Sequence, residues 1–188
     1  MTLRARHVLF VVLLLASGAS AQSLNPGPPG PFVIDVRGVT SGLPTTAALY
    51  PELTFQDAVP ARGFGYDVGA HVYRFHLGAA RLGLGANYIR VNGKAPDAQV
   101  TMQLFVPQLS FNFGTANGWS YLSAGAGPVR VLGDKRFDTT SINAGGGARW
   151  FTSSHLAIGF DIRLHKLAAI KTFPQTMLVS ASVGVSVK

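Results

Sequence analysis

Hydrophobic and polar residues alternate one by one along much of this chain, most clearly between residues 141 and 165. This stretch predicts two strands joined by the polar turn at residues 152–154. Successive side chains of a strand point to opposite faces, so the second strand has one apolar and one polar face. The apolar face carries Leu156, Ile158, Phe160, Ile162 and Leu164, and the other carries Ala157, Gly159, Asp161, Arg163 and His165. A polar face crowded with glycine and fixed charges is typical of the narrow lumen of a small membrane barrel.

The same alternation predicts six further strands. They cover about residues 32–40, 63–75, 80–91, 100–113, 119–131 and 176–188. The connections after the first, third, fifth and seventh strands run to about 22, 7, 8 and 10 residues, and the others to about three to five. We therefore predict an all-β fold, an eight-stranded antiparallel up-and-down transmembrane β-barrel with short periplasmic turns and longer extracellular loops.

The fourth predicted strand has an apolar row on each face. Its outward row is Phe105, Leu109, Phe111 and Phe113, and the inward residues beside it are Gln108, Ser110 and Asn112. The preceding residues Val100, Met102, Leu104 and Val106 are apolar on the other face. Either this upper half protrudes above the lipid, or a bulge near Pro107 exchanges the faces. Protrusion is favoured, because residues 105–113 alone nearly cross an apolar band of about 25 Å.

The first residues predict export. Residues 1–21 combine a basic start at Arg4 and Arg6, an apolar run over residues 8–16 and a small-residue cleavage site at residues 19–21. The apolar run is far shorter than the roughly 20 residues of a membrane-spanning helix. We therefore predict a cleaved signal peptide over residues 1–21, a Pro/Gly-rich leader over 22–31 and a barrel domain over 32–188. No later stretch is long and apolar enough to span as a helix, which leaves a soluble chain or one inserted as strands.

Composition narrows the candidate chemistry. Hydrophobic residues make up 47% and charged residues 13%, which leaves little charge for a water-facing surface. There is no cysteine, so disulfides, thiolate metal sites and a cysteine nucleophile are excluded. Without Arg4 and Arg6, which lie in the predicted signal peptide, the chain has 14 basic and 8 acidic residues, so its net charge is +6. No basic and aromatic cluster shares one element, so anionic lipid is a better counter-charge than nucleic acid.

Four segments resemble a known family. They are FVPQLSFNFG, GWSYLSAGAG, INAGGGARWF and LAIGFDIRLH, and they resemble the small eight-stranded outer-membrane β-barrels that include the OmpA transmembrane domain, OmpX and the opacity proteins. The resemblance covers the chain from about residue 32. It implies the outer membrane of a diderm bacterium and the barrel-insertion machinery as a partner. The chain differs in lacking a peptidoglycan-binding domain and in ending in Val187 and Lys188, where the family usually has an aromatic residue.

Six charged residues share the inward face of their strands. They are Asp35, Arg37, Asp67, Arg149, Asp161 and Arg163. Charge clusters can mark active sites, but in a narrow lumen three acids and three bases are expected to pair and plug the barrel. With a three-residue turn at 152–154, Asp161 falls opposite Gly145. Arg37, reaching into the space above Gly145 and Gly147, is then the expected partner of Asp161.

The sequence offers no convincing catalytic or metal site. His155 and His165 lie ten residues apart on one strand, which separates them by about 33 Å, too far to share a metal ion. His71 has no evident co-ligands. A lipid A deacylase would need a histidine and a serine two residues apart. The residues two positions after His71, His76, His155 and His165 are Tyr73, Gly78, Ala157 and Leu167. A lipid A acyltransfer enzyme built from loop residues and a small-solute pore remain open, whereas a soluble lipocalin-like carrier would need an apolar lumen.

We therefore predict a non-enzymatic outer-membrane barrel without a cofactor. Its role is structural, or adhesion to host or envelope surface ligands through the extracellular loops. Basic residues near the long-loop end are expected to contact lipopolysaccharide: Arg90, Arg130, Lys135, Arg136, Lys166 and Lys171. An aromatic girdle is expected near the short turns, formed by Tyr73, Phe75, Phe111, Phe113, Trp119 and Trp150.

Overall fold

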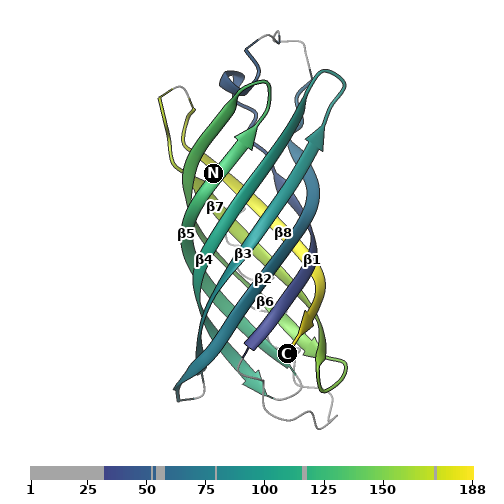
Figure 1. The fold of residues 1–188 in the computed structure, drawn as a ribbon, viewed down its shortest axis with the longest axis vertical. Coiled ribbons are helices and arrows are strands. Elements are labelled where there is room, and N and C mark those ends of the chain that lie inside the picture. Colours follow the sequence, from purple (N-terminus) through teal and green to yellow (C-terminus); the bar gives the residue numbers. More distant parts are fainter. Residues whose placement is uncertain (1–31, 52, 54–57, 79, 116–117, 172) are drawn as a thin grey trace, which may run out of the picture.

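The computed structural model describes residues 32–51, 53, 58–78, 80–115, 118–171 and 173–188, and shows a closed antiparallel barrel of eight strands in chain order (Figure 1). The strands are β1 (Phe32–Gly42), β2 (Arg62–Leu77), β3 (Ala80–Lys94), β4 (Gln99–Thr115), β5 (Gly118–Leu132), β6 (Arg136–Phe151), β7 (Leu156–Leu167) and β8 (Thr176–Val187). Pairing of β1 with β8 closes the barrel. The predicted fold class is confirmed. The predicted signal peptide and leader lie outside the described residues.

The two ends of the barrel differ in their connections. At one end the strands are joined by residues 43–61 and 168–175 and by the shorter segments 95–98 and 133–135. We call this end the long-loop end. At the short-turn end the connections are residues 78–79, 116–117 and 152–155, and both Phe32 and Lys188 lie there (Figure 1). The difference is smaller than predicted, because β3, β4, β5 and β6 extend into their predicted loops. A 3₁₀ turn, η1 (Ala47–Leu49), is the one helical element within the described residues, and no helix among them has the length and apolar character to cross a membrane.

The β4 strand runs without a bulge. Its pairing with β3 keeps one register from Gln99 opposite Lys94 to Phe113 opposite Ala80. Pro107 lies opposite Ala86 within this ladder, and every even-numbered residue from Val100 to Asn112 is buried while the odd ones face outward. The predicted alternative of a bulge near Pro107 is therefore wrong. The apolar row at residues 100–106 points into the barrel, on the same side as Gln108.

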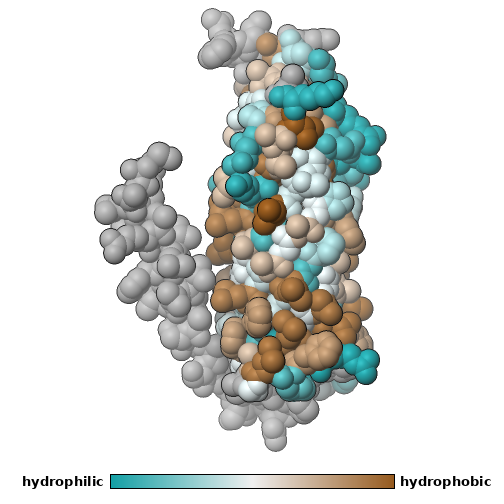
Figure 2. Space-filling view, turned by 90° about the vertical axis from the view of Figure 1, so that its left-hand side faces the viewer, coloured by the Kyte–Doolittle hydropathy of each residue, from teal (hydrophilic) through white to brown (hydrophobic). Residues whose placement is uncertain are grey.

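The barrel consists of two halves with opposite patterns. In the half next to the long-loop end, the long-loop half, the interior is an apolar core: Val39, Leu43, Leu49, Tyr50, Ile89, Val91, Ala98, Val100, Met102, Leu104, Val106, Val129, Val131, Leu167, Phe173 and Leu178. In the other half, the short-turn half, the interior is polar and the exterior apolar. Figure 2 shows apolar side chains gathered over the lower part of the barrel and hydrophilic ones over the upper part. The lumen is thus polar along only part of its length. For β4 the favoured alternative already placed an apolar row on the inward face, but the sequence analysis did not extend this to the other strands.

Two members of the predicted aromatic girdle lie inside the barrel. Tyr73 and Trp119 are buried, and Trp119 packs edge-on against both Tyr73 and Phe151. With Val33, Tyr121 and Ala157 they form a small core that closes the short-turn end. The other predicted girdle members are exposed on the outer surface: Phe75, Phe111, Phe113 and Trp150.

Candidate functional site

The polar interior of the short-turn half is organised around Asp35. Its carboxylate accepts hydrogen bonds from Nε and Nη2 of Arg149 at 3.0 and 2.6 Å. Nη2 of Arg37 lies 2.8 Å from the same carboxylate, and Nε2 of His71 lies 3.4 Å away. The Ser186 hydroxyl donates a further hydrogen bond. One fully buried carboxylate therefore faces two guanidinium groups, an imidazole and a hydroxyl.

A second ion pair joins Asp161 and Arg163. Nη2 of Arg163 lies 3.1 Å from the carboxylate of Asp161, which also accepts the hydroxyl hydrogen of Tyr121 at 2.9 Å. Nη1 of Arg163 donates to the Asn143 side chain at 2.8 Å, and Nη2 also donates to the Ser123 hydroxyl at 2.9 Å. The Arg149 guanidinium lies over the Tyr121 ring, 4.4 Å from its centroid. Tyr121 thus connects the Asp161 group to the Asp35 group.

Amides extend the network to Asp67. Arg37 lies opposite Asp67 in the β1–β2 ladder, and its Nη1 reaches the Asp67 carboxylate at 3.5 Å. Asn87 donates to Asp67 at 2.6 Å, and Gln108 donates to Asn87 at 2.7 Å. Three acids and three arginines therefore share one buried network, in which each charge has a partner of opposite sign.

Glycines on facing strands make room for these large side chains. Gly147 lies opposite Asp161 across β6 and β7. A Cβ atom at Gly147 would lie 2.8 Å from the Tyr121 hydroxyl and closer still to a backbone carbonyl of β7. A larger residue there would therefore require the β7 backbone or the Tyr121 side chain to shift.

The predicted pairing of Arg37 with Asp161 is wrong. Arg37 contacts Asp35 and Asp67, while Asp161 is paired with Arg163, its neighbour two residues along the same face of β7. The predicted register was in error by two residues, because Asp161 lies opposite Gly147 instead of Gly145. The structure nevertheless places all six predicted charged side chains inside the barrel, at 4% exposure or less. The sequence analysis missed the partners Tyr121, Asn87, Asn143 and Gln108, although their inward position on alternating strands is a signal that could have found them.

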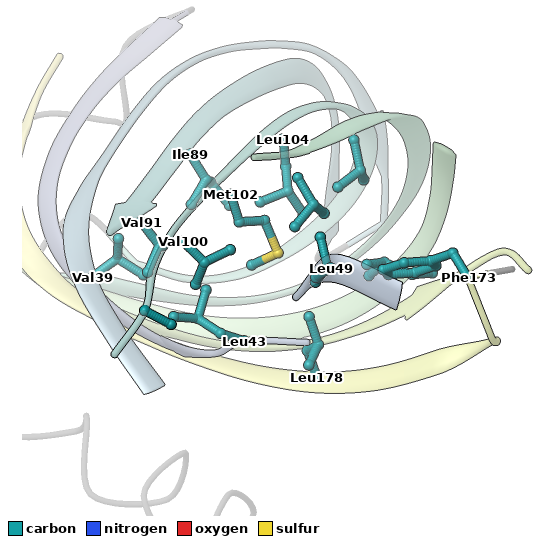
Figure 3. Close-up of a cluster of buried hydrophobic side chains, with 14 of the residues drawn as sticks. Val39, Leu43, Leu49, Ile89, Val91, Val100, Met102, Leu104, Phe173 and Leu178 are labelled. Atoms are coloured by element: carbon teal, nitrogen blue, oxygen red, sulfur yellow. The ribbon is translucent and has the colours of Figure 1, made fainter. Parts of the chain in front are cut away.

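Loop residues close the long-loop end from above. Leu43, Leu49 and Tyr50 from residues 43–61, and Phe173 from residues 168–175, are buried against the apolar core. Figure 3 shows Leu49 and Phe173 within the ring of strands, facing Met102 and Leu104. Burial and the negative charge of Asp134 raise the pKa of Tyr50 to about 12. The first loop therefore folds into the mouth of the barrel.

The geometry does not support a catalytic triad or a metal centre. His165 Nε2 lies 3.0 Å from the Ser180 hydroxyl, but both side chains are buried in the lumen. His155 Nδ1 lies 2.7 Å from the hydroxyl of Ser154, its neighbour in the exposed turn. Within the described residues neither histidine forms an ion pair with a carboxylate, the group that would orient it as a general base. The same residues include no group of three metal-ligating side chains.

The predicted basic rim divides into two groups. Arg90, Gln103, Arg130 and Asp138 are direct cross-strand neighbours on the outer face of β3 to β6. Asp138 accepts hydrogen bonds from Nε of Arg130 at 2.8 Å and from Nε of Arg136 at 2.7 Å. The remaining predicted members follow β5, lie on β7 or lie in residues 168–175: Lys135, Lys166 and Lys171. The strand pairing therefore brings Arg90, Arg130 and Arg136 together on one wall of the barrel.

An open pocket of about 490 Å³ lies between two connections of the long-loop end. It is lined by residues 94–99, 101 and 132–134. Lys94, Asp97 and Asp134 are its charged members, and the Asp97 carboxylate already accepts the backbone N–H of Ala58 at 2.8 Å. The mixed charges give the pocket no marked preference for one class of ligand.

Comparison with known proteins finds no matching family model and no matching curated protein. Several solved structures are similar. Neisserial surface protein A, NspA, has a TM-score of 0.58 at 18% identity, covering 86% of this chain and 99% of its own. OprG from Pseudomonas aeruginosa has a TM-score of 0.54 at 11% identity, covering 86% of this chain and 97% of its own. Ail, the attachment invasion locus protein of Yersinia pestis, has a TM-score of 0.52 at 9% identity, covering 83% of this chain and 95% of its own. At these identities the similarity establishes the fold, and it confirms the resemblance to small eight-stranded outer-membrane barrels at that level.

Proposed function

We propose that this chain, which has the fold of the small outer-membrane β-barrels, is a non-enzymatic surface protein of the outer membrane. Its short-turn half spans the lipid, with the short turns in the periplasm. Its long-loop half stands above the lipid as a rigid platform whose outer strand faces and loop surfaces make contact with other molecules.

The outer face of β4 is the observation that supports this proposal most strongly. From the long-loop end downward, its outward residues are first Gln99, Thr101 and Gln103, and then Phe105 and Leu109. The inward residues change in the opposite sense along the same strand, from Val100 and its apolar successors to polar side chains. A strand exposes apolar side chains where it meets lipid and polar ones where it meets water. The change of pattern therefore marks a passage from lipid to water.

Three closed layers favour a plugged barrel over a pore. The apolar core and the loop residues packed into it fill the long-loop half. The ion-pair network occupies the centre, and the aromatic core around Trp119 closes the short-turn end. Small solutes would have to displace all three layers. In planar bilayers we expect no steady conductance, and a large steady conductance would reject the plug.

The structure also favours a particular contact surface. Because Leu49 and Tyr50 fold into the barrel mouth, the first loop is not a free arm. The row from Arg90 through Gln103 to Arg130 lies on the outer wall directly above the outward aromatic residues Tyr88 and Phe105. Arginine donates paired hydrogen bonds that suit phosphate oxygens. We propose that this row contacts lipopolysaccharide phosphates.

Epitope tags test the orientation on which the proposal rests. One tag is inserted at Thr45, an exposed residue of the first loop, and another at Ser153 in the exposed β6–β7 turn. We expect antibody to label the Thr45 tag on intact cells, and the Ser153 tag only after the outer membrane is permeabilised. Labelling of the Ser153 tag alone on intact cells would invert the topology and overturn the proposal.

The lipopolysaccharide contact has its own test. Arg90→Gln should lower the amount of lipopolysaccharide that copurifies with the barrel, because it removes one of the two arginines in the row. Lys171→Gln makes the same change of charge in residues 168–175, away from the row, and serves as the control. Equal retention by Arg90→Gln and the wild type would reject this contact.

A further inference from the structure

The short-turn end carries only basic charge among its described side chains outside the lumen. These side chains are Arg74, Arg81 and Lys188, with His76 beside them. The described acidic side chains lie elsewhere. Three are in the buried network (Asp35, Asp67 and Asp161), and three are at the long-loop end (Asp97, Asp134 and Asp138). The long-loop rim therefore has acids to compensate its arginines, and the described part of the short-turn rim has no acidic side chain.

The basic residues gather on the β2–β3 hairpin. All residues from Arg74 to Gly78 are exposed, because this hairpin extends past the mouth of the barrel. A register shift between Val72 and Phe75 separates it from the rest of the β2–β3 ladder. Beyond the shift, His76 lies opposite Arg81. Within the described residues no carboxylate lies within ion-pair distance of Arg74.

The other face of the same hairpin is apolar. Phe75 and Leu77 alternate with the basic residues and are 57% and 55% exposed. The neighbouring strand continues this surface, because Phe111 lies opposite Leu82 and Phe113 opposite Ala80. Both phenylalanines are exposed as well. The hairpin thus presents an apolar face toward lipid and cationic side chains at the level where that lipid ends.

We propose that the β2–β3 hairpin binds the head group of an anionic glycerophospholipid in the leaflet next to the short turns. Phe75 and Leu77 lie against the acyl chains, and Arg74, the exposed residue next to Phe75, donates hydrogen bonds to the phosphate. A zwitterionic lipid offers the same phosphate with its charge already compensated, so the hairpin prefers the anionic lipid. This inference rests on the proposed function, since it requires the short-turn half to lie in the membrane.

Lipid binding to the purified, delipidated barrel tests the inference. The barrel in detergent is titrated with phosphatidylglycerol or phosphatidylcholine, and bound lipid is counted by native mass spectrometry. A basic residue at a membrane surface is worth about 1 kcal/mol, so Arg74→Gln should weaken phosphatidylglycerol binding about fivefold. Phosphatidylcholine binding should not change. Arg74→Lys keeps the charge without the paired donors and should fall between Arg74→Gln and the wild type.

The control variant Arg62→Gln removes the same charge from the long-loop end. It should leave phosphatidylglycerol binding unchanged. Equal losses in Arg62→Gln and Arg74→Gln would mean that net charge alone causes the effect, and would overturn the inference. Unchanged binding in Arg74→Gln would overturn it as well. A loss of binding to peptidoglycan fragments, with lipid binding intact, would assign the hairpin to a different partner and also overturn it. The epitope tags report separately on orientation, so failure of the proposed function is distinguishable from failure of this site.

Discussion

The long-loop half and the short-turn half of this barrel are built from the same strands, yet their interiors have opposite chemistry. Val100 and Met102 lie in an apolar core, whereas Gln108 and Asn112, further along the same face of β4, belong to a polar interior. No bulge separates them. The comparison shows that the strand backbone does not determine which face of the barrel wall is apolar. The medium around the barrel determines it. Water outside the wall requires an apolar interior, whereas lipid outside the wall permits a polar interior.

The two interiors are also stabilised differently. The apolar core gains from removing hydrocarbon from water, and it recruits loop residues such as Leu49 and Phe173 to complete itself. The polar interior depends on ion pairs, and the desolvation cost of buried charges is offset only while each retains its partner. A substitution that is mild in one half is therefore expected to be severe in the other.

The largest effect is expected from Asp35→Ala in the polar interior. This change leaves Arg149 buried without a carboxylate partner and leaves Arg37 with only its longer contact to Asp67. Breaking a buried pair in this way costs about 3–5 kcal/mol. Urea unfolding of the barrel in lipid vesicles measures the loss of unfolding free energy. A loss below about 1 kcal/mol would show that Asp35 does not organise the network.

Double-mutant cycles sharpen this prediction. Asp35→Ala with Arg149→Ala should lose clearly less than the sum of the single losses, because the two groups are in direct contact. Asp161→Ala with Arg37→Ala should be closer to additive, since Asp161 is paired with Arg163 instead. Equal coupling in the two cycles would contradict the pairing described here.

The next largest effect is expected from an arginine on the lipid-facing wall. Leu109 and Gln103 both point outward from β4, one in each half. Leu109→Arg places a charge in lipid and should cost about 2–4 kcal/mol near the bilayer midplane. Gln103→Arg is the matched control and should change the unfolding free energy by less than about 1 kcal/mol, because it lies in water. Similar losses of unfolding free energy at both positions would contradict a boundary between lipid and water at this level of β4.

A smaller effect is expected from Leu49→Ala in the loop that caps the apolar core. Leu49 is fully buried, and removing a buried leucine side chain costs about 2 kcal/mol or more. The low end is expected here, since a loop can relax into the space. Thr45→Ala changes an exposed residue of the same loop and should have little effect. If the two variants unfolded alike, the loop would not be part of the core.

The smallest effect is expected from Asp138→Asn on the outer surface. Its ion pairs with Arg130 and Arg136 are short, but all three side chains are about half exposed. Exposed ion pairs contribute little to stability, because water and salt screen both charges. The same vesicle unfolding experiment should therefore show no clear difference between Asp138→Asn and the wild type. A loss as large as that of Asp35→Ala would mean that exposure does not separate the two sets of ion pairs.

Alternation along the chain predicted the eight strands, because side-chain direction in a strand is a local property with a period of two. For the same reason the inward position of residues such as Asp35 and Arg37 could be derived from the sequence. The ion pairs between strands, such as Asp35 with Arg149, could not be derived in this way. They depend on the register between strands, and an error of two residues at the β6–β7 turn moved Asp161 from Gly147 to Gly145. The pair of Asp161 with Arg163 lies within β7, so the alternation alone already allowed it.

The apolar row at residues 100–106 was harder to interpret for a different reason. Its alternation identifies a strand but not the medium outside it. The buried positions of Leu49 and Phe173, which come from distant loops, complete the core around that row. Tyr73 and Trp119 were misplaced on the outer surface for a similar reason, because aromatic residues suit both a lipid interface and a closed interior.

The central claim is that the change of pattern along β4 coincides with the surface of the membrane, and single cysteines test it most directly. The chain has no native cysteine, so each introduced thiol reports alone. Cysteines at the outward positions Gln99, Thr101 and Gln103 should react with a membrane-impermeant maleimide in intact cells, and those at Phe105, Leu109 and Phe111 should be protected. Uniform reactivity or uniform protection along this face would contradict the account.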